Sequence, residues 1–343
     1  MKNMSLHIDS RSADLLRSTA LFLVVLLHVS ATYFHDFHAS WSVSVFYGSV
    51  SRICIPLFFM LSGALLLEKQ EPVGRFFRKR AAKVIVPTLF WSLAYLLYRK
   101  YGMGQRDASL DPTTMLHGPT YYHLWFMYAI MMLYMATPVL RLFHRHASLG
   151  LKLGALAFWF VACSALPVLG VYSLAPTGFD LRFIPIYGGF MLLGALLARH
   201  EERWALATSA LLFALGTALT FIMTIWYSHW IDTPDQKFYD YLAPNVILAA
   251  VGAYLLIARS GSRMPPRPQR AIQLLSRYTF GVYFLHVIVL NALQGFLFHE
   301  YYGLMLRGVD ALFAIPAQAL GTVLVSLLIV AGMRRIPVMR HVV

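Results

Sequence analysis

Two ionisable side chains, Arg17 and His28, lie eleven residues apart in the first apolar stretch of the chain. In a helix this separation comes to ~1100°, within ~20° of three full turns, so both side chains share one face at ~16 Å along the axis. An imidazole has an unperturbed pKa of ~6.5, which suits a general base at neutral pH. His28 is therefore a candidate catalytic base, or alternatively a hydrogen-bonding group between helices. Arg17, which Asp14 can pair with, is either part of the same site or a snorkelling anchor.

Arg52 is a third candidate, because it lies within a second apolar stretch, SVSRICIPLFFMLSG. Placing an arginine at the centre of a membrane helix costs ~2.5–3.5 kcal/mol, which argues for an anionic partner: a carboxylate, a phosphate or a developing oxyanion. The alternative is a bond to a helix carbonyl or a side chain that snorkels outward. Pro56, four residues later, frees backbone carbonyls for such a bond.

Two later segments add candidate substrate-binding residues. His123 and Trp125 open a predicted span in YYHLWFM, where a tryptophan is also ordinary at the membrane interface. His286 and Tyr283 are three residues apart on one face of another predicted span, so the two side chains can share a polar patch.

The segment EKQEPVGRFFRKRAAK (68–83) concentrates basic side chains, with six in sixteen residues. One interpretation is a topology signal that also attracts anionic lipid. The other is a site for a phosphorylated ligand, held by Arg75, Arg78, Arg80 and Lys83, since Arg and Lys clamp phosphate oxygens.

The elements that position these residues follow from composition. The chain has 343 residues, of which 59% are hydrophobic and 13% charged, with a mean hydropathy of +0.61. Soluble proteins are typically ~45–50% apolar and ~25% charged, so both a soluble protein and a disordered chain are excluded.

The apolar runs do not alternate between apolar and polar residues, which predicts membrane-spanning helices rather than a β-barrel. We therefore expect an all-α polytopic membrane bundle of about ten helices in a single domain, 1–343. The predicted spans are 15–34, 43–67, 84–98, 123–140, 153–171, 183–198, 204–227, 241–258, 278–298 and 309–333.

The loop charges predict the orientation of the bundle. Of the 29 Lys and Arg residues, 22 fall on the side that holds both termini and six on the other, which places both termini in the cytoplasm. A Pro- and Arg-rich cytoplasmic linker is expected at 259–277. Residues 1–31 also admit a cleaved signal peptide, although Arg17 and His28 interrupt its apolar core. The net charge of +14 is thus a topology signal, and no nucleic-acid partner is expected.

Motifs for hydrolase, zincin, P-loop or dinucleotide-binding chemistry are missing from the sequence. The H-x-H pair His144 and His146 has no third ligand nearby in the sequence, and neither cysteine has metal-ligand spacing. No metal site is therefore expected.

Five segments also form a recognisable series. They are ADLLRSTALFLVVLLHV (13–29), SRICIPLFFMLSGALLL (51–67), RFFRKRAAKVIVP (75–87), YHLWFMYAIMMLY (122–134) and SRYTFGVYFLHVIVL (276–290). In order and spacing they resemble the acyltransferase 3 family of membrane proteins, over residues of about 9 to 300. The chain looks most like the branch that includes the enterobacterial common antigen O-acetyltransferase.

The resemblance implies a ten-span enzyme of the bacterial inner membrane. Such an enzyme transfers an acyl group, commonly acetyl, from cytoplasmic acyl-CoA to a hydroxyl of an extracytoplasmic glycan or lipid-linked sugar. By motif, His28 would be the catalytic histidine and Arg17 its partner. Either Arg75 with Arg78 or Arg80 with Lys83 would be the donor-side basic pair. Where the family often has His-Pro in span nine, this chain has His286-Val287, which leaves the role of His286 open.

We expect His28 to remove the acceptor proton as the hydroxyl attacks the thioester, with Arg52 stabilising the oxyanion or positioning an anionic group. A covalent acyl-histidine is the alternative route. A secondary transporter or glycan exporter is the alternative function, because it has the same hydropathy and also uses buried His and Arg. Paired half-repeats, typical of many transporters, are not seen in the sequence.

Overall fold

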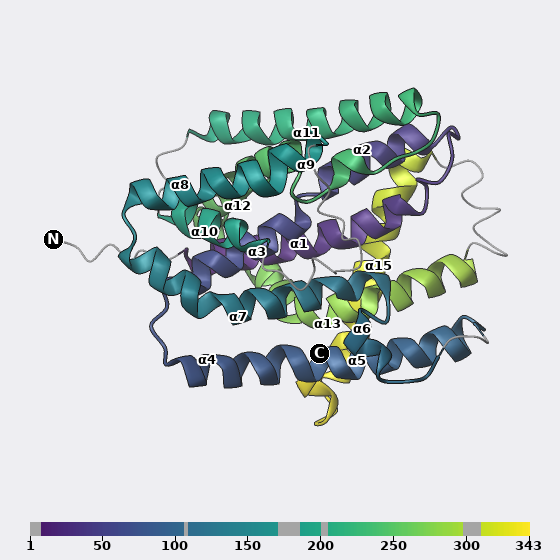
Figure 1. Ribbon diagram of the computed structural model, residues 1–343. Helices are drawn as coiled ribbons and strands as arrows, with labels where there is room; N and C mark the ends of the chain where they lie inside the picture. Colours follow the sequence, from purple (N-terminus) through teal and green to yellow (C-terminus); the bar gives the residue numbers. More distant parts are fainter. Residues whose placement is uncertain (1–7, 106–108, 171–185, 200–204, 298–309) are drawn as a thin grey trace.

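The computed structural model describes residues 8–105, 109–170, 186–199, 205–297 and 310–343, and these residues form a bundle of helices without a strand (Figure 1). The first half contains α1 (Ser10–Ala31), α2 (Trp41–Ser51), α3 (Cys54–Leu66), α4 (Val73–Arg80), α5 (Val86–Leu97), α6 (Thr114–His117) and α7 (Trp125–His146). The second half contains α8 (Leu149–Phe160), α9 (Leu166–Val168), α10 (Gly188–Ala198), α11 (Leu206–Trp230), α12 (Pro244–Ser262), α13 (Pro266–Leu297) and α15 (Ala311–Met333). One π-helical turn, η1 (Ala81–Ile85), joins α4 to α5, and short 3-10 turns η3 (Tyr122–Leu124) and η7 (Lys237–Tyr239) precede α7 and α12.

Nine helical runs within the described residues are long and apolar enough to cross a membrane. They correspond to nine of the ten predicted spans, and the prediction of a polytopic helical membrane protein is confirmed. The tenth predicted span, 183–198, begins outside the described residues and contains the shorter apolar helix α10. Side chains such as Leu93 on α5, Leu211 on α11 and Leu328 on α15 are exposed, as expected of lipid-facing positions.

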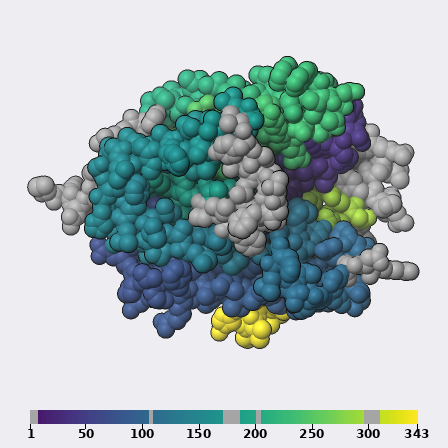
Figure 2. All heavy atoms as spheres, viewed as in Figure 1, coloured from purple at the N-terminus to yellow at the C-terminus, as the bar shows by residue number. Residues whose placement is uncertain are grey.

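Helix α1 occupies the middle of the bundle and packs against α2, α3, α12, α13 and α15 (Figure 1). The run α4–α5 and helix α11 lie at opposite edges, and the last residues emerge beside α4–α5 (Figure 2). Asp9 caps the start of α1 by accepting a hydrogen bond from the backbone N–H of Ser12. Because α1 is surrounded by helices, Asp14, Arg17 and His28 on it are partly buried by protein, whereas Arg11 in its first turn is exposed.

Two glycines let α3 and α10 approach closely. A Cβ atom added at Gly63 would lie 1.9 Å from the carbonyl oxygen of Met191, and one at Gly194 would lie 2.1 Å from that of Met60. Both partner atoms are backbone, so they cannot move aside without moving a helix. Close backbone approach at small residues is a common way for membrane helices to associate.

We therefore expect Gly63→Ala to destabilise the bundle by about 1–3 kcal/mol, the usual cost of overpacking. Thermal unfolding of the detergent-purified protein measures this loss. Gly321→Ala on α15 is the matched control, because an added Cβ at Gly321 meets no atom within 4 Å. Equal melting temperatures for the two variants would contradict the close packing of α3 on α10.

The predicted second span is divided into two helices. Helix α2 ends at Ser51, and α3 begins at Cys54, so Arg52 and Ile53 form the break between them. Pro56 lies in the first turn of α3, where its missing N–H costs no helical hydrogen bond. The break places Arg52 inside the bundle, between two helices rather than within one.

Helix α13 begins earlier than the sequence pattern suggests. It starts at Pro266, so residues 266–277 of the expected linker are helical, and only 263–265 separate α12 from α13. Proline is well tolerated at the first position of a helix, and the polar residues that follow extend the helix beyond its apolar window. This extension brings Ser276 and Arg277 onto the same helix as Tyr283 and His286.

Candidate active site

A cavity of about 890 Å³ opens where α1 begins, enclosed by α1, α3, α5, α7, α13 and the segment after α15. Its basic wall residues are Arg17, Arg80, Lys83, Arg277, Arg334 and Arg340. We call this space the basic cavity. The segment after α15 is held against α5 by the indole N–H of Trp91, which donates to the carbonyl oxygen of Val342 at 2.8 Å.

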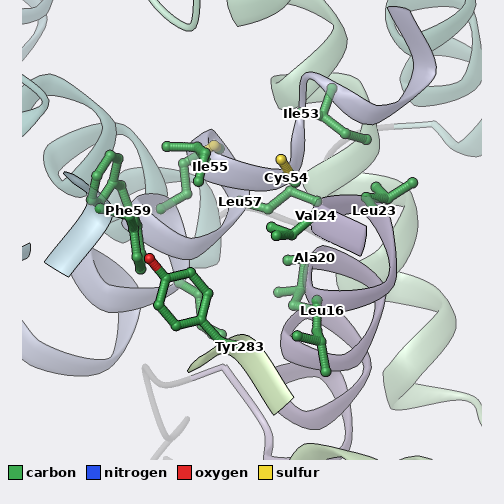
Figure 3. Close-up of a cluster of buried hydrophobic side chains, with 14 of the residues drawn as sticks. Leu16, Ala20, Leu23, Val24, Ile53, Cys54, Ile55, Leu57, Phe59 and Tyr283 are labelled. Atoms are coloured by element: carbon green, nitrogen blue, oxygen red, sulfur yellow. The ribbon is translucent and has the colours of Figure 1, made fainter. Parts of the chain in front are cut away.

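The remaining wall of the basic cavity is largely apolar and continues inward along α13. Ser276, Thr279, Phe280 and Tyr283 line it on successive turns, which spans ~10 Å at 1.5 Å per residue. Phe126 of α7 lines the cavity as well, and its ring centroid is 5.7 Å from that of Tyr283. Figure 3 shows Tyr283 beside the packed core of α1 and α3. The cavity thus combines a cationic mouth with an apolar arm that ends at Tyr283.

Arg17 is held at the wall of the basic cavity by two neighbours. Its guanidinium lies 3.2 Å from the carboxylate of Asp14 and donates to the hydroxyl of Ser276 at 2.7 Å. The Ser276 hydroxyl in turn donates to Asp14 at 2.6 Å. The expected pairing of Arg17 with Asp14 is therefore present, and Ser276 extends it to α13.

Three imidazole rings, from His28, His123 and His286, meet further along α1; we call them the histidine cluster. The ring of His28 is stacked on that of His286 with centroids 5.3 Å apart, and His123 lies 5.2 Å from His286 and 6.4 Å from His28. These residues come from α1, η3 and α13, which are far apart in the sequence. Among the described residues, no group of three or more His, Cys, Asp and Glu side chains is arranged to hold a metal ion.

Tyr283 connects the basic cavity to the histidine cluster. Its hydroxyl donates to the backbone carbonyl of His123 at 2.5 Å, and its own carbonyl lies 2.6 Å from Nδ1 of His286. If Nδ1 of a neutral His286 carries the proton, Nε2 is left with a free lone pair. Nε2 of His286 and both ring nitrogens of His123 are buried and make no hydrogen bond within the described part of the chain. The rings of Tyr283 and His286 have centroids 6.0 Å apart, so the two side chains lie near each other and next to His123.

His28 is the accessible member of the histidine cluster. His123 and His286 are 2% and 0% exposed, whereas His28 is half-buried. The ring of Tyr122, which is 52% exposed, lies 5.1 Å from His28. His28 is thus the partly exposed histidine of the cluster, it does not line the basic cavity, and an exposed aromatic ring adjoins it.

Arg52 lies outside the basic cavity, among aromatic rings. Its guanidinium carbon is 4.3 Å from the ring centroid of Tyr239 and 5.7 Å from that of Tyr241. The indole of Trp125 is stacked on Tyr241, with centroids 5.6 Å apart and planes at 24°. Arg52 also interacts electrostatically with His28. The structure thus brings Arg52 and Trp125 to one site, where the sequence shows them only in separate segments.

The four basic candidates of the 68–83 segment fall into two classes. Arg80 and Lys83 line the basic cavity, whereas Arg75 and Arg78 are exposed and do not line it. The division follows from helix geometry, because at 100° per residue Arg75 lies ~140° and Arg78 ~160° around the helix from Arg80.

Glu71 anchors the segment that carries Arg80. Its carboxylate lies 3.2 Å from Arg141 of α7 and 4.0 Å from Arg80. Burial alone would raise the pKa of Glu71, but the hydrogen bond from Arg141 and the charges of Lys69, Arg141 and Arg80 outweigh it and lower the pKa below its usual value. Glu71 therefore stays ionised near neutral pH and ties Arg80 to α7.

Several cavity residues were not among the sequence candidates. Arg277, Arg334 and Arg340 appear in the sequence only as loop charges that set topology, and Ser276 carries no signal of its own. The rings of Tyr239 and Tyr241 likewise give no sequence sign that they face Arg52. A tertiary structure is needed because all of these contacts join distant parts of the chain.

A family model described as an acyltransferase domain, that of the acyltransferase 3 family, matches residues 10–331. No curated protein and no solved structure shows a significant match to the chain. The family match covers most of the chain, including the helices that form the basic cavity and the histidine cluster. The chain therefore belongs to the acyltransferase 3 family of membrane acyltransferases.

Proposed function

We propose that the protein is an O-acetyltransferase of the bacterial inner membrane. It transfers the acetyl group of cytoplasmic acetyl-CoA to a hydroxyl of an extracytoplasmic glycan or lipid-linked sugar, as in the branch that includes the enterobacterial common antigen O-acetyltransferase. One observation carries the proposal: the basic cavity follows α13 to Tyr283, whose carbonyl meets His286, and His286 stacks on His28. A donor on one side and an acceptor on the other thus converge on one imidazole.

The basic cavity fits the chemistry of an acyl-CoA. Phosphate groups suit the cationic mouth, where Arg80 and Lys83 are the proposed donor-binding pair and Arg17 lines the same cavity. The apolar arm suits the pantetheine chain and leads the thioester toward Tyr283. By the loop charges this mouth faces the cytoplasm, where acyl-CoA is made.

His28 is the proposed general base. The acceptor hydroxyl oxygen attacks the thioester carbonyl carbon while His28 takes the hydroxyl proton, and collapse of the tetrahedral intermediate expels the CoA thiolate. The thiolate then takes up a proton, which His28 can return, so the reaction is balanced. In the alternative route, His28 itself attacks the thioester and the acyl-imidazole is transferred in a second step.

The acceptor is proposed to enter beside Tyr122. His123, Trp125, Tyr283 and His286 are the proposed acceptor-side residues, of which Trp125 offers a partly accessible ring surface for a sugar. His123 and His286 are buried behind His28, so they act by holding its ring rather than by enclosing the glycan.

The test uses inner-membrane vesicles that contain the protein, supplied with radiolabelled acetyl-CoA. We expect inverted vesicles, which expose the cytoplasmic face, to incorporate label into lumenal glycan or lipid-linked sugar, and right-side-out vesicles to incorporate none. The vesicles without the protein are the control. Glycan accumulation without consumption of acetyl-CoA would instead support a transporter.

A further inference from the structure

We propose that Arg52, framed by Tyr239 and Tyr241, binds an anionic group of the acceptor. The group is a carboxylate of an acidic sugar or a phosphate of a lipid-linked sugar. This inference rests on the proposed function and narrows it, since it makes the acceptor an anion and gives Arg52 a role in acceptor binding rather than in oxyanion stabilisation.

The charge of Arg52 is poorly compensated by its surroundings. Within the described residues no carboxylate lies at ion-pair distance from Arg52, whereas Arg17 and Arg141 each have one at 3.2 Å. Its polar contacts are neutral groups, the side-chain oxygen of Gln236 at 3.4 Å and the side chain of Tyr241, and Nε is buried without a hydrogen-bond partner. A cation inside a membrane bundle is costly without an anion, so a bound ligand is the natural source of the missing charge.

Tyr239 packs against the guanidinium of Arg52 and the side chain of Tyr241 makes one hydrogen bond with it, which leaves the rest of the N–H edge available. Tyr239 lies with its ring 4.3 Å from the guanidinium carbon, and its hydroxyl donates to the carbonyl of Val45 at 2.9 Å, which fixes the ring. Ring faces interact with the guanidinium as a cation–π pair and do not use up its N–H groups. The planar N–H fork of arginine matches carboxylate and phosphate oxygens two at a time.

The position of Arg52 favours the acceptor over the donor. Arg52 does not line the basic cavity, whereas it interacts electrostatically with His28, the partly exposed member of the histidine cluster. The Trp125–Tyr241 stack adjoins it and offers aromatic surface for a sugar ring. An acidic sugar held by Arg52 would therefore present its hydroxyls on the side of His28.

The experiment measures ligand binding by the full-length protein in lipid nanodiscs, without acyl transfer. The probes are methyl glucuronide, glucose 1-phosphate and the neutral methyl glucoside, each titrated by calorimetry. We expect at least one anionic probe to bind about tenfold more tightly than methyl glucoside, as one charge-assisted pair allows. Arg52→Gln should remove this preference, and Arg52→Lys should keep part of it. A preference for the glucuronide indicates an acidic sugar, and one for the phosphate indicates a lipid-linked sugar.

Lys237→Gln is the matched control, because Lys237 is an exposed cation in the neighbouring η7 turn and lies 4.9 Å from Tyr227 rather than over Tyr239. It should leave the preference for the anionic probe unchanged. Equal loss in both variants, or a preference that survives in Arg52→Gln, overturns the proposal. If Arg52→Gln does not fold, the wild-type protein decides, since equal affinity for charged and neutral glycosides also overturns it. Because no acetyl-CoA is present, a failure of acyl transfer in vesicles remains a separate result.

Discussion

His28→Ala is expected to lower acyl transfer in vesicles by about 10²–10⁴-fold, the usual contribution of a general base. The imidazole is the partly exposed member of the histidine cluster, and it lies between the buried ring of His286 and the exposed ring of Tyr122. The other two imidazoles, those of His123 and His286, are buried and cannot replace it in contact with the acceptor. The measurement is the initial rate of label transfer from acetyl-CoA to glycan at saturating donor.

His35→Ala is the control for this experiment, because His35 is exposed in the segment after α1 and lies outside the histidine cluster. It should transfer at the wild-type rate. Donor binding by His28→Ala should also stay intact, since His28 does not line the basic cavity. Unchanged transfer by His28→Ala would remove it from the mechanism, whereas label retained on the wild-type protein but not on this variant would favour the acyl-histidine route.

The second large effect is expected from the basic pair at the cavity wall. The double variant Arg80→Ala with Lys83→Ala should raise the KM for acetyl-CoA by about tenfold or more, because a hydrogen bond to a charged group contributes about 1.5–3 kcal/mol. The turnover at saturating donor should change much less, since neither residue belongs to the histidine cluster. Steady-state transfer at a series of acetyl-CoA concentrations separates the two parameters.

The chain supplies a control with the same loss of charge. Arg75→Ala with Arg78→Ala removes two cations from the same segment, but both side chains are exposed and neither lines the basic cavity. If the cavity-lining pair binds the donor directly, the KM of this control variant for acetyl-CoA should stay near that of the wild type. Equal KM increases in the two double variants would mean that the segment acts through its general charge, and a larger increase in the control would reverse the assignment.

The sequence by itself determined the helical membrane architecture. Apolar windows of about twenty residues are enough to locate membrane helices, because backbone groups in lipid must be satisfied within each helix. The periodicity of α1 also predicted the pairing of Arg17 with Asp14, since this contact depends on one helix only. Two helix ends were not predicted. The break at Arg52 falls within a continuous apolar window, and α13 begins at Pro266 with polar residues that lie before its apolar window.

Only the tertiary structure decided which helices are neighbours, and therefore what the site is. His123 and His286 are separated by more than 160 positions in the chain, and no pattern along it indicates that their rings lie 5.2 Å apart beside His28. The choice of Arg80 and Lys83 over Arg75 and Arg78 at the basic cavity likewise depends on how α4 and η1 turn toward α13. Periodicity shows which face of a helix is polar, but it does not show which other helix that face contacts. The contact is selected by packing between helices, which depends on small residues such as Gly63 and on interhelical hydrogen bonds.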